Sequence, residues 1–151
     1  MQMGLIGLGK MGFNMRERLR EGGHEVIGYD PRPEVTDVPT LDALAQALKP
    51  PRTVWVMVPS GPVTHETIAP LSEVLSPGDL VIDGGNSRYT EDGPHAKLLG
   101  DKGISFVDAG VSGGIWGLKE GYGLMVGGAK VNVDRAMPIF DTLSSSSNPS
   151  E

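Results

Sequence analysis

The stretch MGLIGLGKMG, residues 3–12, decides the fold of this chain. A short apolar run leads into glycines at positions 7, 9 and 12, which is the spacing G-x-G-x-x-G. In dinucleotide-binding folds this pattern joins a first strand to a first helix. Gly7 permits the tight turn, Gly9 lets a pyrophosphate approach the backbone, and Gly12 allows close packing of helix on strand. The start of the helix then offers unpaired N–H groups and a positive dipole end to an anion.

The same fingerprint requires an acidic residue about 20 positions further on, which binds the ribose hydroxyls of the cofactor. Asp30 fits, because it ends the second apolar run, HEVIGYD, at residues 24–30. Its carboxylate would face a 2′-phosphate, so the sequence favours NAD. Arg32 keeps NADP open, because its guanidinium can pair with that phosphate. Arg32 also fits a second interpretation, that of a solvated loop residue.

Strands and helices alternate along the rest of the chain. The apolar patterns predict further strands at residues 53–58, 79–83, 104–111 and 124–128, and helices at 10–23, 41–48, 63–75 and 91–101. Asn132 or Asp134 is expected to open a last helix that runs to Leu143. This order predicts an α/β fold of the Rossmann type, a doubly wound and mostly parallel sheet with helices on both faces. Ligands in such folds bind outside the carboxyl ends of the strands.

The composition excludes several classes of protein. The chain has 151 residues, 38% hydrophobic and 21% charged, which suits one soluble globular domain. A net charge of −6 argues against nucleic-acid binding. The chain has no cysteine, and its three histidines are far apart, so we expect no disulfide and no metal site. We expect a cytoplasmic protein that does not bind membranes, because no apolar run is long enough to span one and no signal peptide is visible.

Two more glycine-rich segments carry a resemblance to a known family. They are VIDGGNS at residues 81–87 and GVSGG at residues 110–114. With them, residues 1 to about 143 resemble the β-hydroxyacid dehydrogenases, and among these decarboxylating 6-phosphogluconate dehydrogenase. DGGNS is the more specific signal, because relatives acting on hydroxyisobutyrate or similar acids usually carry a D-x-S-T-type segment there. GGIWGLKEGYGLMVGG, residues 113–128, resembles the shorter, often NAD-linked branch of the 6-phosphogluconate enzymes.

The resemblance implies a role for each strand end. Asn86 would lie between nicotinamide and substrate, and Ser112, Gly113 and Gly114 would bind the sugar acid 6-phosphogluconate. The residues implied to bind the cofactor are Gly7, Leu8, Gly9, Lys10, Met11, Gly12, Asp30, Arg32, Val58, Pro59, Ser60 and Asn86. A plain turn between strand and helix is the alternative explanation for the 110–114 segment, and a side-chain-to-backbone turn bond is the alternative for Asn86. Trp116 and Tyr122 are expected to pack rather than to bind ligand.

The implied reaction oxidises C3 of 6-phosphogluconate by hydride transfer to NAD(P), and the 3-keto acid then loses CO₂ to give ribulose 5-phosphate. The family's lysine base, with a nearby asparagine and a glutamate proton donor, comes from an all-helical C-terminal domain. We expect that domain beyond residue 151, because Lys119 and Lys130 do not match the catalytic position. The same domain would make the full-length protein a homodimer. The Ser-rich tail at 144–151 fits a native end, an artificial junction or the stump of a longer enzyme, and we favour the stump.

One departure from the family concerns the link from Asp30 to Thr40, which is very short. The family usually has a longer crossover helix and strand there, so the adenosine pocket is expected to be more open and the preference for NAD stays unsettled. Two other functions remain alternatives. One is a β-hydroxyacid dehydrogenase acting on another small 3-hydroxy acid, and the other is a non-catalytic dinucleotide-binding module.

Overall fold

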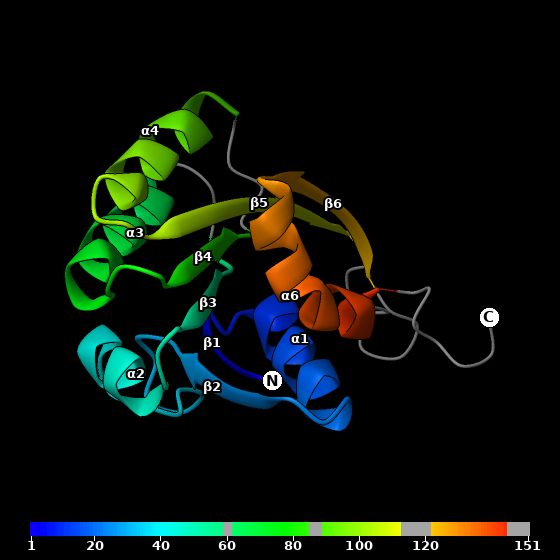
Figure 1. The fold of residues 1–151 in the computed structure, drawn as a ribbon. Helices are drawn as coiled ribbons and strands as arrows, with labels where there is room; N and C mark the ends of the chain where they lie inside the picture. The colour runs from blue at the N-terminus through cyan, green and yellow to red at the C-terminus, as the bar shows by residue number, and fades with distance from the viewer. Residues whose placement is uncertain (59–61, 85–88, 113–121, 145–151) are drawn as a thin grey trace.

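A single six-stranded sheet forms the centre of the molecule (Figure 1). The computed structural model describes residues 1–58, 62–84, 89–112 and 122–144. The strand order is β2-β1-β3-β4-β5-β6. The first five strands pair in parallel, and β6 runs antiparallel to β5 at one edge. The strands are β1 (Gln2–Ile6), β2 (Glu25–Tyr29), β3 (Thr53–Val56), β4 (Leu80–Asp83), β5 (Ser105–Ser112) and β6 (Gly123–Gly128). The predicted mostly parallel, doubly wound sheet is therefore confirmed.

Helices cover both faces of this sheet, as the alternating pattern predicts (Figure 1). On one face lie α1 (Lys10–Glu21) and α6 (Lys130–Leu143), which pack on each other. On the other face α3 (Pro62–Val74) lies between α2 (Leu41–Ala47) and α4 (Tyr89–Gly100). Within the described residues, no helix has the length and apolar character that crossing a membrane would require.

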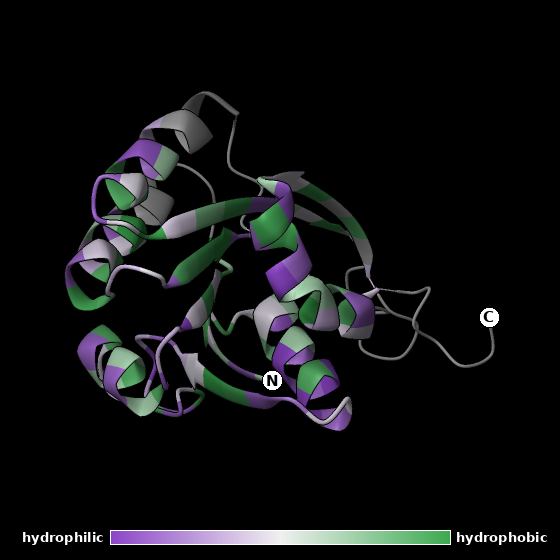
Figure 2. Ribbon diagram, viewed as in Figure 1, coloured by the Kyte–Doolittle hydropathy of each residue, from purple (hydrophilic) through white to green (hydrophobic). Residues whose placement is uncertain are grey.

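Alternate residues of each strand enter two separate hydrophobic cores, because successive side chains of a strand point to opposite faces. Trp55 packs into the core beneath α1 and α6, whereas its neighbours Val54 and Val56 pack beneath α2, α3 and α4. The middle strands are consequently apolar on both sides, and Figure 2 shows them largely in green. Tyr122 is fully buried in the first of these cores, which confirms its predicted packing role.

The link between β2 and α2, residues 31–39, contains neither helix nor strand. It is held to the edge of the sheet by Asp37, whose N–H donates to the carbonyl of Gly28 and whose carboxylate accepts from the Gly28 N–H at 2.7 Å. The same carboxylate pairs with Arg16 at 3.1 Å and with Arg20 at 2.8 Å. Two cations from α1 thus fix a link that has no regular structure of its own.

The start of α6 corrects one expectation from the sequence. The helix begins at Lys130 with Ala129 as its N-cap, not at Asn132 or Asp134. The carbonyl of Ala129 accepts from the N–H groups of both Asn132 and Val133, so the first turn forms directly after β6. Asp134 instead forms an i,i+4 ion pair with Lys130 at 2.7 Å. The helix follows the strand with a single intervening residue, and that connection overrides the local capping preference.

Asp79 joins the amino ends of β3 and β4, far from the glycine turn. It is fully buried, and its carboxylate accepts from the Arg52 N–H at 2.7 Å, the Arg52 guanidinium at 3.0 Å and the Ser76 N–H at 2.8 Å. Removing it leaves three donors unpaired inside the protein. We therefore expect Asp79→Ala to lower the free energy of unfolding by about 3 kcal/mol, measured by urea denaturation.

The matched control is Asp101→Ala. Asp101 is exposed and pairs only at the surface with Lys97, so its loss should change stability by about 0.5 kcal/mol or less. Equal effects of the two substitutions would show that the buried network contributes nothing beyond its charge.

Candidate functional site

A cavity of about 510 Å³ opens at the carboxyl ends of β1, β2 and β3. It brings together the glycine turn, through Gly7 and Gly9, with Asp30, Arg32 and Val58. These residues are separated by up to about fifty positions in the chain, and parallel pairing of the three strands places them at one edge. The place agrees with the rule that ligands of open α/β sheets bind outside the carboxyl ends of the strands.

The glycine turn is tight enough to require glycine at two positions. Gly7 has a φ of +95°, and a Cβ there would lie 2.4 Å from the carbonyl oxygen of Met57. A Cβ on Gly12 would lie 1.9 Å from the carbonyl oxygen of Gly7, so only glycine lets α1 pass so close to the turn. A Cβ on Gly9 would meet no protein atom within 4 Å. Gly9 therefore leaves open space at the N-cap of α1 that a ligand can occupy.

Asp30 ties the end of β2 to this turn. Its Oδ2 accepts a hydrogen bond of 2.9 Å from the Leu8 N–H, and its Oδ1 accepts from the Arg32 N–H at 3.0 Å and from Arg32 Nε at 2.9 Å. The guanidinium of Arg32 also donates through Nη2 to the carbonyl of Leu8 at 2.7 Å. Asp30, Arg32 and Leu8 thus form a closed ring of hydrogen bonds at the mouth of the cavity.

This ring sets the protonation of the Asp30 carboxylate. Burial alone would raise its pKa, but the hydrogen bonds from Arg32 and Leu8 and the charge of Arg32 together outweigh burial, so the pKa of Asp30 lies below its ordinary value. Only 9% of the Asp30 side chain is exposed, against 50% for Arg32. The Asp30 carboxylate is therefore charged and largely covered by the protein, whereas half of the Arg32 side chain is exposed.

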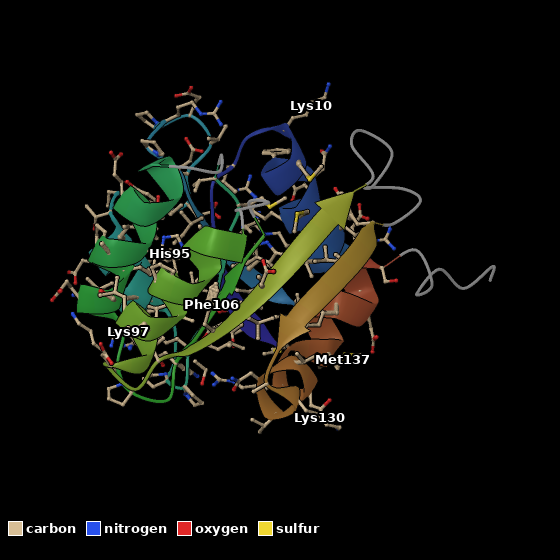
Figure 3. All side chains as sticks on the ribbon, turned by 90° about the horizontal axis from the view of Figure 1, so that it is seen from above. Lys10, His95, Lys97, Phe106, Lys130 and Met137 are labelled. Atoms are coloured by element: carbon tan, nitrogen blue, oxygen red, sulfur yellow. The ribbon has the colours of Figure 1, made fainter. Side chains whose placement is uncertain are left out.

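The other predicted cofactor residues lie at the start of α1 or outside the described part of the chain. Lys10 projects outward from the first turn of α1 (Figure 3). Met11 is half-buried and packs against the core beneath α1 and α6. Ser112 ends β5. Outside the described residues lie Pro59, Ser60, Asn86, Gly113 and Gly114.

Sequence reasoning missed residues that other elements contribute to the cavity. Leu41 comes from the start of α2, and Glu66 and Thr67 come from the second turn of α3. A second hollow of about 350 Å³, formed by the 31–39 link, shares Asp30 and Pro31 with the cavity. No local pattern in the sequence signals these residues, because only the packing of α2 and α3 brings them to the glycine turn.

These features fit a dinucleotide. The crowded Gly12, the open space at Gly9 and the N–H groups at the start of α1 suit a pyrophosphate, and the cavity has the volume of a small-molecule site. Among the residues that the structure describes, no three histidine, aspartate or glutamate side chains gather as metal ligands.

Gly9 and Gly12 offer a test that separates folding from binding. Gly12→Ala forces a methyl group into the Gly7 carbonyl, and we expect it to lower the free energy of unfolding by about 3 kcal/mol. Gly9→Ala has room in the protein and should cost about 1 kcal/mol or less, yet its methyl group would occupy the place of the pyrophosphate. We expect it to weaken NAD binding at least about tenfold in isothermal titration calorimetry, which corresponds to 1.4 kcal/mol. Unchanged NAD affinity in the Gly9 variant would contradict this placement of the pyrophosphate.

Known proteins share both the sequence and the fold of this chain. The chain is 34% identical to the NAD(+)-dependent, decarboxylating 6-phosphogluconate dehydrogenase of Haloferax volcanii, over 95% of this chain and 50% of that protein. A solved structure of 6-phosphogluconate dehydrogenase from Plasmodium falciparum, studied with NADP+ and with 6-phosphogluconate, superposes with a TM-score of 0.88 at 30% identity over 95% of this chain and 34% of that chain. The 3-hydroxyisobutyrate dehydrogenase of Mycobacterium tuberculosis gives a TM-score of 0.84 at 28% identity, over 95% and 52%.

The chain spans about half the length of the Haloferax relative and a third of the Plasmodium chain. The family model for the NAD binding domain of 6-phosphogluconate dehydrogenase matches residues 2–148, which is nearly all of the sequence. A glycine turn that needs Gly12, an acidic residue at the end of β2 and a cavity between them are the features expected of such a domain. The chain therefore belongs to the NAD-binding domain family of 6-phosphogluconate dehydrogenase.

Proposed function

We propose that this chain is the cofactor-binding part of an NAD(P)-dependent oxidoreductase that converts 6-phosphogluconate to ribulose 5-phosphate and CO₂. The observation that carries the proposal is the cavity where Gly7, Gly9, Asp30 and Arg32 meet, in a chain whose family binds NAD. The names of the Haloferax and Plasmodium relatives support the substrate. We expect the full-length enzyme to be a cytoplasmic homodimer.

The residues of this chain would bind and orient the reactants. The turn from Gly7 to Gly12 would hold the pyrophosphate, with the N–H groups of Lys10 and Met11 directed at it, and Asp30 and Arg32 would meet the adenosine ribose. NAD(P), when bound, supplies the hydride acceptor. The rate enhancement from this half would come mainly from holding the nicotinamide in a fixed position and orientation.

The proposed substrate site follows two neighbouring strands. β4 and β5 pair in parallel, with Asp83 opposite Asp108, so both chains leave the sheet at the same edge. Asn86 comes three residues after the end of β4, and Ser112 ends β5, with Gly113 and Gly114 directly after it. Neighbouring exits of this kind favour a shared site for Asn86 and the 112–114 segment. An amide that both donates and accepts suits a ligand with hydroxyl and carboxylate groups.

Two other functions have specific support. The likeness to the 3-hydroxyisobutyrate dehydrogenase of Mycobacterium tuberculosis favours a dehydrogenase for another small 3-hydroxy acid. A dinucleotide-binding module without chemistry is the other alternative, because the cavity at the glycine turn needs only the described residues of this chain.

The test is a binding and turnover panel. NAD and NADP binding to this chain is measured by calorimetry, and reduced cofactor and released CO₂ are followed for the full-length protein with 6-phosphogluconate and with 3-hydroxyisobutyrate. CO₂ release with 6-phosphogluconate supports the main proposal, and turnover of 3-hydroxyisobutyrate without CO₂ supports the second. Cofactor binding without any turnover by the full-length protein supports the binding module, and absence of cofactor binding would overturn all three.

Arg32→Ala tests the choice of cofactor more cleanly than a change at Asp30. Asp30→Ala would also break the bond to Leu8 and disturb the turn for every ligand. Arg32→Ala keeps that bond and removes the charge that would pair with a 2′-phosphate. We expect NADP affinity to fall about tenfold and NAD affinity to stay within about twofold in calorimetry.

The control is Lys97→Ala, which removes one exposed cation from α4, away from the cavity (Figure 3). It should leave both affinities unchanged. A loss of both cofactors to the same extent in the Arg32 variant would mean that Arg32 supports the turn rather than the 2′-phosphate.

A further inference from the structure

The cavity continues past Asp30 and Arg32 to a wall formed by α2 and α3. Its lining there includes Tyr29, Leu41 and Val58, together with Glu66 and Thr67 from α3. Most of this part is apolar, so the polar groups of Glu66 and Thr67 stand out against it. A site that is mainly apolar with a few placed polar groups is typical of small-molecule recognition, where the polar groups fix orientation.

The order of groups in the cofactor places the adenine base at this wall. The pyrophosphate belongs at the glycine turn, and the adenosine ribose belongs at Asp30. The base is attached to the ribose on the side away from the pyrophosphate. It would therefore extend from Asp30 toward the rest of the cavity lining, which includes Leu41 from α2 and Glu66 and Thr67 from α3.

The Glu66 carboxylate is available to a ligand. Within the described residues, Glu66 has no hydrogen bond and no ion pair, although it lies on the cavity and is exposed. Asp30 differs in this respect, because both of its oxygens already accept bonds from Leu8 and Arg32. A charged carboxylate accepts hydrogen bonds and donates none, so Glu66 can complement only a donor.

Adenine offers one such donor at its edge. Its exocyclic N6 amino group donates, whereas its N7 accepts, and guanine carries the acceptor O6 in place of the amino group. Hypoxanthine has the same O6, and its N1 carries a proton that adenine lacks, so the two bases are distinguished by a carboxylate that faces position 6 from the N7 side. A carboxylate beside this position attracts the amino group of adenine and repels the carbonyl oxygen of hypoxanthine.

We propose that Glu66 determines the base specificity of the cofactor site by accepting a hydrogen bond from the N6 amino group of adenine. The proposal rests on the proposed cofactor function and adds a residue from α3, outside the glycine fingerprint. It makes the site selective for an adenine dinucleotide over its hypoxanthine counterpart.

The experiment compares binding of NAD and of nicotinamide hypoxanthine dinucleotide to the full chain by calorimetry. The unaltered chain should bind NAD about fivefold more tightly, since a charge-assisted bond at an exposed site is worth part of its buried value. Glu66→Gln should abolish or reverse this preference, because an amide can donate to O6 as well as accept from N6.

The matched control is Glu73→Gln on the same helix. Glu73 pairs with Lys102 at the surface and does not line the cavity, so its variant removes the same charge and should keep the preference. Circular dichroism of each variant checks the fold.

Three outcomes overturn the proposal. Equal binding of the two dinucleotides by the unaltered chain shows that the base edge is not recognised. A preference that survives in the Glu66 variant shows that another group recognises it. If neither dinucleotide binds, the cofactor function itself fails, which is a different result from binding without discrimination.

Discussion

The site depends on one close approach, that of Gly12 in the first turn of α1 to the carbonyl oxygen of Gly7. A Cβ at position 12 would lie 1.9 Å from that oxygen, so the geometry exists only with glycine. The approach holds the start of α1 close to the end of β1, and the first N–H groups of a helix have no partner within it. Packing of helix on strand and binding of an anion therefore depend on the same contact.

The ring of Asp30, Arg32 and Leu8 extends this constraint to the second strand. The bond from the Leu8 N–H to Asp30 fixes the distance between the glycine turn and the end of β2. The Leu8 N–H donates to Oδ2 and Arg32 donates to Oδ1, so both oxygens of the Asp30 carboxylate already accept hydrogen bonds within the protein. The charge that a 2′-phosphate would meet is consequently that of an ion pair, in which Asp30 repels and Arg32 attracts. Under the proposed function, we expect the preference between NAD and NADP to depend on Arg32 as much as on Asp30.

The sequence predicted those features that depend on local pattern or fixed spacing. The alternation of apolar runs predicts the sheet, and the spacing from Gly7 to Asp30 predicts that two strand ends meet. The sequence could not predict that Glu66 and Leu41 line the cavity, because their positions depend on how α2 and α3 pack on the sheet. Nor could it predict that Asp37 of the link pairs with Arg16 and Arg20 of α1, since these charges are typical of any solvated surface. The predicted start of α6 was wrong for a related reason, because the capping rule takes no account of the strand that ends at Gly128.

The core on the side of α6 also bears on the proposed substrate site, through Trp55 and Gly84. The Trp55 ring meets Phe140 of α6 edge-on, with centroids 5.8 Å apart and an angle of 70° between the planes. A Cβ on Gly84 would lie 2.3 Å from Trp55 Nε1, so the indole closes the space beside the residue that follows β4. Asn86 comes two residues later. The buried aromatic pair therefore requires glycine directly after β4. Exchange of Trp55 for a smaller residue would loosen the core at Phe140 and open space beside Gly84, so the packing of α6 on the sheet and the residue directly after β4 are coupled.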